Sequence, residues 1–113
     1  MEDCLFCKII TKQIKSESVY EDDDLICIKD IHPQAPVHLL IIPKKHISTV
    51  IDISEEDEKL VGKMIRTAAK ISKQFNINES GFRLIFNCNR DGGQTIYHIH
   101  LHLIGGKRLK WSQ

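Results

Sequence analysis

Three histidines alternate with aliphatic residues near the end of the chain, in the segment YHIHLHLIGG at residues 97–106. His98, His100 and His102 are separated by single apolar residues, so a strand over 97–104 would place all three imidazoles on one face. A neutral imidazole is a competent nucleophile near neutral pH, because its ordinary pKa is about 6.5. Three such rings on one face therefore predict chemistry rather than a solvated surface.

A single metal ion held by all three rings explains this pattern poorly. Same-face neighbours lie roughly 6.6 Å apart and the outer pair roughly 13 Å apart, from a rise of about 3.3 Å per residue. Two neighbours could share an ion, but three ligands from one straight strand would be strained. The pattern favours covalent catalysis by the middle ring: attack on phosphorus gives a phosphohistidine that water then opens, while the flanking rings orient the nucleophile, bind phosphate oxygens or protonate a leaving group.

The loop before these histidines, DGGQT at 91–95, suits a phosphate ligand. Its two glycines allow backbone amides to approach an anion closely, and Thr95 adds a hydroxyl. A Gly-Gly pair is usually only a hairpin turn, so the loop supports phosphate chemistry because His100 follows it.

Two helices and five strands are expected to position these residues. Apolar residues at helical spacing predict one long helix within 53–75, with Ser54 and the acidic residues after it as its N-terminal cap. A short helix is expected within 4–12. Strands are expected at 18–22, 25–30, 37–43, 82–88 and 97–104. Tight loops between consecutive strands favour antiparallel pairing, so the predicted class is α+β: a five-stranded antiparallel meander sheet with the long helix on one face and a short N-terminal helix.

Length and composition narrow the function classes. The chain has 113 residues and is expected to form one domain, residues 1–113. Its formal net charge of +1 gives no electrostatic case for binding nucleic acid or a membrane surface. The start, MEDCLFCKII, predicts no signal peptide, and no window predicts a transmembrane helix, so we expect a cytoplasmic protein. Because disulfides are rare in the cytoplasm, Cys27 and Cys88 are expected to be buried or half-buried free thiols.

The segment HIHLHLI resembles the signature His-φ-His-φ-His-φ-φ, with φ apolar, of the histidine triad (HIT) family of nucleotide hydrolases and transferases. The stretches DIHPQAPVHLLIIPKKHIS and DGGQTIYHIHLHLIGGKRLKW are similar to the Hint branch, the purine nucleoside phosphoramidases once labelled protein kinase C inhibitors. The likeness covers nearly the whole chain, so it implies a HIT-like fold.

The resemblance implies catalytic roles for four histidines. His100 matches the nucleophile that becomes covalently nucleotidylated. His102 and His38 match the partners that flank it, and His98 matches the first, supporting member of the triad. Besides His100 and His102, the implied nucleotide-binding residues comprise a base pocket, a carboxylate for both ribose hydroxyls and contacts around the α-phosphate: Phe6, Ile14, Ile31, Asp30, Asn87, Gly93 and Thr95.

The implied activity is hydrolysis of the P–N bond of purine nucleoside 5′-phosphoramidates, which releases AMP or GMP. The implied partners are the purine nucleotide substrate and a second copy of the chain in a homodimer, with no organic cofactor. Two alternatives stay open: hydrolysis of dinucleoside polyphosphates, and a non-catalytic nucleotide-binding or scaffolding module. DGGQT and Trp111 argue against the first, and the retained histidines argue against the second. Lys29 and Lys110 stand where some Hint relatives have histidine, and the second bears on leaving-group preference.

Cys4 and Cys7 form a C-x-x-C pair, a spacing at which two thiolates can bind one ion. A thioredoxin-like redox role does not fit, because the chain lacks the βαβ context of that motif. Some HIT relatives with a similar C-x-F-C start carry a structural zinc on two cysteines and two histidines. The implied ligands here are Cys4, Cys7, His46 and His98, a closed Cys₂His₂ set with no open position for water. Two free thiols on a short helix are the alternative.

Overall fold

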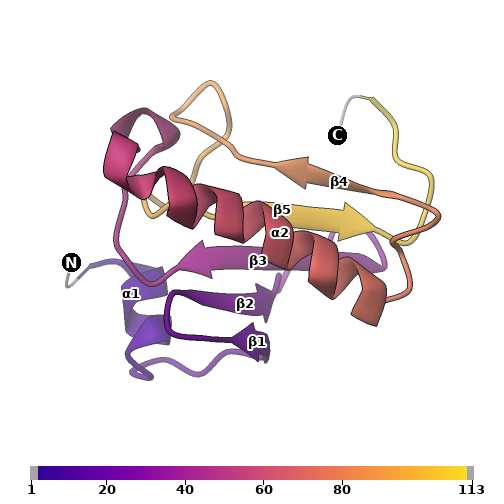
Figure 1. Ribbon diagram of the computed structural model, residues 1–113, viewed down its shortest axis with the longest axis horizontal. Coiled ribbons are helices and arrows are strands. Elements are labelled where there is room, and N and C mark those ends of the chain that lie inside the picture. The colour runs from indigo at the N-terminus through magenta and orange to yellow at the C-terminus, as the bar shows by residue number, and fades with distance from the viewer. Residues whose placement is uncertain (1–2, 112–113) are drawn as a thin grey trace.

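The computed structural model describes residues 3–111 (Figure 1). The helices and strands, in chain order, are α1 (Leu5–Ile10), β1 (Ser18–Glu21), β2 (Leu25–Lys29), β3 (Val37–Pro43), α2 (Glu58–Gln74), β4 (Phe82–Ile85) and β5 (Leu101–Gly105). All neighbouring strands pair antiparallel. The predicted α+β class, with five antiparallel strands, one long helix and a short N-terminal helix, is therefore confirmed. Within residues 3–111, no helix combines the length and apolar character needed to cross a membrane.

The strand order is β1-β2-β3-β5-β4, so the prediction of a simple meander is wrong at its second half. The long connection through α2 carries the chain across the sheet, and β4 therefore forms at the outer edge (Figure 1). β5 then fills the place between β3 and β4. This insertion puts His38 of β3 and His102 of β5 on adjacent central strands.

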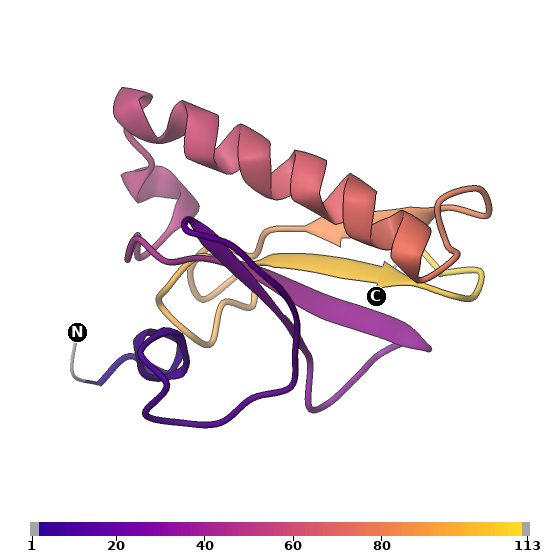
Figure 2. The same ribbon diagram turned by 60° about the horizontal axis from the view of Figure 1, so that its bottom comes forward.

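Alternating side chains give the sheet two apolar faces, which the two helices cover from opposite sides (Figure 2). Met64, Ala68 and Ile71 of α2 pack on one face, in the cluster that also contains Leu25, Cys27, Leu39, Ile41, Leu101 and Leu103. Phe6 and Ile9 of α1 pack on the other face, in the cluster that also contains Ile26, Ile28, Leu40 and Ile42. The nearly continuous apolar run of β3 follows from this two-sided burial.

The predicted histidine strand at 97–104 is too long at its start, because the ladder of β5 begins only at Leu101. Pairing between β3 and β5 stops at Ile41 and Leu101. N-terminal to Leu101, the backbone N–H of Ile99 donates instead to the carbonyl of Ile47, 2.7 Å away. Ile47 lies beyond Pro43, the last residue of β3. His98 and His100 therefore lie on the loop segment that precedes β5, outside the sheet. The predicted strand at 82–88 likewise ends early, at Ile85.

The start of the long helix matches the predicted cap but not the predicted boundary. An oxygen of Asp57 accepts hydrogen bonds from the backbone N–H and the hydroxyl of Ser54, at 3.1 and 3.0 Å. This cap closes a 3₁₀ turn at Glu55–Asp57, and α2 itself begins at Glu58. Helical spacing of apolar residues alone does not give the buried face of α2, because Ile65 is 46% exposed whereas Thr67 is buried.

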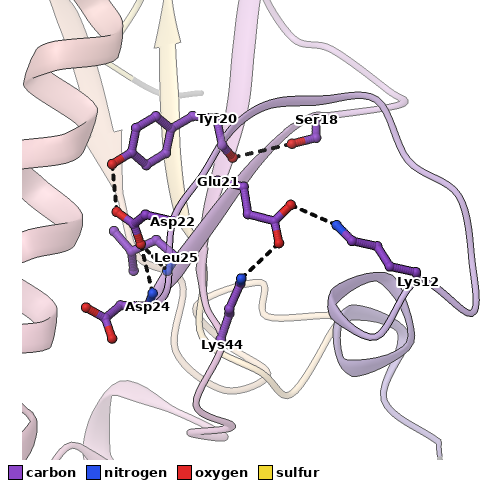
Figure 3. A network of polar contacts seen from close by, with 8 residues as sticks. All are labelled: Lys12, Ser18, Tyr20, Glu21, Asp22, Asp24, Leu25 and Lys44. Atoms are coloured by element: carbon purple, nitrogen blue, oxygen red, sulfur yellow. Dashed lines mark hydrogen bonds and ion pairs between the residues drawn. The ribbon is translucent and has the colours of Figure 1, made fainter.

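Ion pairs fasten the β1–β2 hairpin to the segments around it (Figure 3). Glu21 accepts from Lys12, just after α1, at 2.7 Å, and pairs with Lys44, just after β3, at 2.8 Å. Hydrogen bonds from these two lysines lower the pKa of the Glu21 carboxyl. The hydroxyl of Tyr20 donates to Asp22 at 2.6 Å, which closes the turn of the hairpin. These contacts connect the segment after α1 with the hairpin and with the end of β3.

Candidate active site

Three of the four predicted catalytic rings, His38, His100 and His102, lie together on the α1 face of the sheet. The ring centroids of His100 and His102 are 5.1 Å apart, and those of His38 and His102 are 5.2 Å apart. Nε2 of His38 lies 2.9 Å from Nδ1 of His102, so these two rings share a hydrogen bond. The edge of Phe6 meets the ring of His100, with centroids 5.0 Å apart.

One hydrogen bond fixes the proton of His100. Its Nδ1 lies 2.9 Å from the backbone carbonyl of His98. A carbonyl oxygen can only accept, so Nδ1 carries the proton, and Nε2 of the neutral ring keeps a free lone pair. This is the nitrogen that a nucleophilic role requires.

Burial keeps these rings in the neutral form at pH 7. It lowers the pKa of His38 and of His100 below their ordinary range, and it lowers the pKa of His102 to about 4. Removing a cation from water disfavours the protonated ring, which is the physical cause of each shift. A nucleophilic role for His100 would require this neutral form, because protonation would occupy its lone pair.

A cavity of about 390 Å³ opens beside His100 and His102. Every residue that the resemblance assigned to the nucleotide lines it: Phe6, Ile14, Asp30, Ile31, Asn87, Gly93, Thr95, His100 and His102. Ile14 and Ile31 are 39% and 84% exposed, so they stand at its mouth. Of the predicted catalytic residues, His38 and His98 are not among those lining the cavity; His38 contacts His102 instead.

Asp30, just beyond the end of β2, is oriented by its neighbours. Its Oδ1 accepts from the backbone N–H of His32 at 2.8 Å. Its Oδ2 lies 3.4 Å from Nε2 of His38. A carboxylate held in this way at the edge of an apolar cavity can accept hydrogen bonds from a vicinal diol.

The backbone conformation of the loop at 91–95 requires glycine at two positions. Gly93 has a φ of +81°, which a residue with a side chain rarely adopts. A Cβ at Gly92 would collide with the backbone of Cys88. The amide of Asn87 donates to the carbonyl of Gly92 at 2.8 Å, so the predicted phosphate contacts Asn87 and Gly93 belong to one folded unit.

The sequence interpretation missed Gln94, which is buried at 6% exposure and holds this loop in place. Its Oε1 accepts from the backbone N–H of Asn89 at 2.9 Å. Its Nε2 donates to the carbonyls of Ser48 and Ile96, at 2.8 and 3.1 Å. No local pattern marks this role, because Ser48 is far away in the sequence.

The two departures from the Hint pattern occupy different places. Lys29 lines the cavity and forms an ion pair with Glu17 at 2.7 Å. Lys110 is exposed, and its carbonyl accepts from Arg83 at 2.7 Å.

Cys4, Cys7, His46 and His98 form a second cluster, whose ligand atoms all lie within 4.8 Å of one another. The sulfurs of Cys4 and Cys7 lie 3.3 and 3.6 Å from Nδ1 of His98, and the sulfur of Cys7 lies 3.4 Å from Nδ1 of His46. The two Nδ1 atoms are 3.1 Å apart. Ordinary zinc bond lengths give tetrahedral edges of about 3.6 Å between sulfur and nitrogen and about 3.3 Å between nitrogens, close to these values.

The tautomer of His98 also leaves a nitrogen free to bind a metal ion. Its Nε2 lies 2.7 Å from the carbonyl of Pro43, which can only accept, so Nδ1 keeps a lone pair directed at the cysteines. The four residues could therefore hold a metal ion such as zinc. Cys27 is buried and Cys88 is half-buried, and both are free thiols, as predicted.

Comparison with known proteins agrees with this geometry. The family model described as "Scavenger mRNA decapping enzyme C-term binding" matches residues 3–111. The chain is 54% identical over 108 residues to a purine nucleoside phosphoramidase of Escherichia coli (strain K12), a match that covers 96% of this chain and 91% of the relative.

Solved structures give the same result. A HIT family hydrolase of Legionella pneumophila Philadelphia 1 superimposes with a TM-score of 0.96 at 47% identity, over 97% of this chain and 98% of that one. A histidine triad protein of Clostridium difficile superimposes with a TM-score of 0.96 at 41% identity, over 100% and 98% of the two chains. With these matches and its alternating His98, His100 and His102, the chain belongs to the histidine triad family, in its Hint branch.

Proposed function

We propose that this chain hydrolyses the P–N bond of purine nucleoside 5′-phosphoramidates through a nucleotidyl intermediate on His100, releasing AMP or GMP. The observation that carries the proposal is the free Nε2 of a neutral His100 beside a cavity with a carboxylate and an apolar slot. The E. coli relative, a purine nucleoside phosphoramidase, supports the substrate class. In this assignment the purine lies among Phe6, Ile14 and Ile31, and the ribose hydroxyls donate to Asp30.

The first step forms a bond between phosphorus and Nε2 of His100 and breaks the P–N bond of the substrate. The electron pair of that bond stays on the amine, which takes up a proton from water. The substituted imidazole now carries positive charge, and the carbonyl of His98, which accepts from Nδ1 at 2.9 Å, stabilises it. Asn87, Gly93, Thr95 and His102 surround the place for the α-phosphate.

The second step regenerates the enzyme. Water attacks phosphorus and gives up a proton to solvent, while the bond between phosphorus and Nε2 breaks and returns the lone pair to His100. The products are the mononucleotide and a neutral imidazole. Because burial holds the pKa of His100 below its ordinary range, the restored ring is ready for a second attack at pH 7.

Turnover of a fluorogenic adenosine 5′-phosphoramidate by the full chain tests the proposal. We expect measurable turnover that His100→Ala removes almost entirely, whereas the more conservative His100→Asn, also inactive, should still bind AMP. Preferential cleavage of dinucleoside polyphosphates would support the first alternative. AMP binding without any turnover would support a non-catalytic module, and either result would overturn the proposal.

We also propose that the Cys₂His₂ cluster holds a structural zinc, since its distances match tetrahedral edges and no ligand position is left for water. We further propose a cytoplasmic homodimer. The edge strand β4 offers unpaired backbone groups, and Trp111 is 96% exposed. Light scattering of the purified chain tests the dimer; a monomeric mass at working concentrations would contradict it.

A further inference from the structure

The loop between β2 and β3, residues 30–36, closes on itself through several hydrogen bonds. The backbone N–H of Asp30 donates to the carbonyl of His38 at 3.0 Å, and that of His32 donates to the side chain of Asp30 at 2.8 Å. The side-chain amide of Gln34 donates to the carbonyl of His32 at 3.0 Å. With Pro33 and Pro36 also restricting its backbone, the loop holds a defined shape.

One further contact of this loop reaches the histidines. The backbone N–H of Gln34 lies 3.0 Å from Nδ1 of His38. An amide N–H can only donate, so Nδ1 of His38 must keep its lone pair, and the neutral ring carries its proton on Nε2. That Nε2–H points at Nδ1 of His102, 2.9 Å away, which must therefore accept. The proton of a neutral His102 is then on its own Nε2, the nitrogen that His38 leaves free.

We propose that the backbone amide of Gln34 is a positioning group that sets the proton positions of both His38 and His102. It touches no reacting atom and acts through His38. The assignment of protons stands on geometry alone, whereas its importance for turnover rests on the proposed function. Its consequence is that His102 presents a hydrogen-bond donor, not a lone pair, to the place for the α-phosphate, where negative charge grows during attack.

With the Gln34 amide in place, His38 and His102 each carry one proton, on Nε2, and neither Nδ1 can take up another. A proton on Nδ1 of His38 would face the Gln34 amide, and one on Nδ1 of His102 would face the Nε2–H of His38. Two titratable groups lie beside the pair: Asp30, with Oδ2 3.4 Å from Nε2 of His38, and His100, which is neutral and adjoins His102. Arg83, on the same face two strands away, donates to the carbonyl of Lys110.

Nitrogen-15 NMR of the full-length wild-type protein, labelled at histidine, reads the tautomers directly. At pH 7 we expect His38 and His102 both protonated at Nε2 and bare at Nδ1. We expect the opposite tautomer for His100, with its proton on Nδ1. Protonation of His38 at Nδ1 would overturn the inference, whatever the enzyme's activity.

Two variants at one position then test the role of the amide. Gln34→Pro removes the backbone N–H, whereas Gln34→Ala keeps it and removes only the side chain, so it is the matched control. Losing this one hydrogen bond should lower kcat about three- to tenfold in Gln34→Pro, while Gln34→Ala stays within about twofold of wild type. Because Nδ1 of His38 would then be free to take up a proton, the acid limb of the pH–rate profile should lie at higher pH for Gln34→Pro than for wild type.

These outcomes separate the inference from the proposed function. If NMR finds the expected tautomers but the protein shows no phosphoramidase turnover, the proposed function is wrong and the proton assignment stands. Equal kcat and equal pH profiles for Gln34→Pro and Gln34→Ala would remove the amide from its positioning role. If Gln34→Pro does not fold, the wild-type NMR spectrum still decides the assignment.

Discussion

Replacing Phe6 by leucine should weaken both the fold and the nucleotide site, because this one side chain serves both. Phe6 is 2% exposed and packs in the α1 core cluster with Ile26, Ile28, Leu40 and Ile42. Its ring edge also contacts His100, and it lines the cavity. An alanine here would cost about 3–5 kcal/mol, a large share of the about 5–15 kcal/mol that stabilises a domain of this size. Leucine keeps most of the apolar volume and leaves a folded protein to measure.

The expected size of the effect follows from two losses. Exchange of one large apolar side chain for another costs up to about 1.5 kcal/mol of unfolding free energy, which lowers the melting temperature by several degrees. Loss of the aromatic contact and of the purine platform should weaken AMP binding by about 0.5–1.5 kcal/mol, or roughly two- to tenfold.

Urea denaturation and calorimetric titration with AMP measure these two quantities separately. Ile71→Val is the matched control, since Ile71 of α2 is fully buried in the other core cluster. It should cost a similar free energy of unfolding, about 0.5–1.5 kcal/mol, and leave AMP affinity unchanged. If Phe6→Leu loses stability but binds AMP like wild type, or if Ile71→Val weakens AMP equally, the reasoning about α1 is refuted.

Three further predictions follow from the site. Asp30→Asn should weaken a ribonucleotide substrate by roughly 1–3 kcal/mol but should cost little on the 2′,3′-dideoxy analogue, as steady-state kinetics on both substrates would show; equal losses would remove Asp30 from the ribose. Elemental analysis should find about one zinc per chain, and Cys4→Ser with Cys7→Ser should lower the melting temperature far more than turnover per folded enzyme; a metal-free protein whose melting is indifferent to chelator would contradict the zinc site. The fold lowers the pKa of His102 to about 4, against about 6.5 in the unfolded chain. As pH falls between these two values, the free energy of unfolding should therefore fall by up to about 1.4 kcal/mol per pH unit. Urea titrations should show a smaller dependence on pH for His102→Gln.

The sequence predicted well that the alternating histidines lie opposite the α2 core cluster, because alternation is a local property. Ile99, Leu101 and Leu103 enter the α2 core cluster, which forces the intervening histidines to the opposite side. Where the ladder stops was not predictable in the same way. The start of β5 depends on where β3 ends, at Pro43, and on the backbone hydrogen bond from Ile99 to Ile47. These residues are far apart in the sequence.

The remaining misses have the same origin. The place of β5 between β3 and β4 depends on how the connection through α2 crosses the sheet, and no local pattern encodes it. Gln34 acts through its backbone amide, so its residue type carried no signal. By contrast, the C-x-x-C pair was visible from spacing alone, while His46 and His98 as its partners came from the family resemblance.

Detection of the covalent intermediate tests the central claim most directly. Full-length enzyme is mixed with an adenosine 5′-phosphoramidate, quenched on the millisecond scale, digested and measured by mass spectrometry. We predict one adenylyl group on the peptide that contains His100, and its absence in His100→Ala. Turnover without an adduct, or an adduct on another residue, would contradict nucleophilic attack by His100.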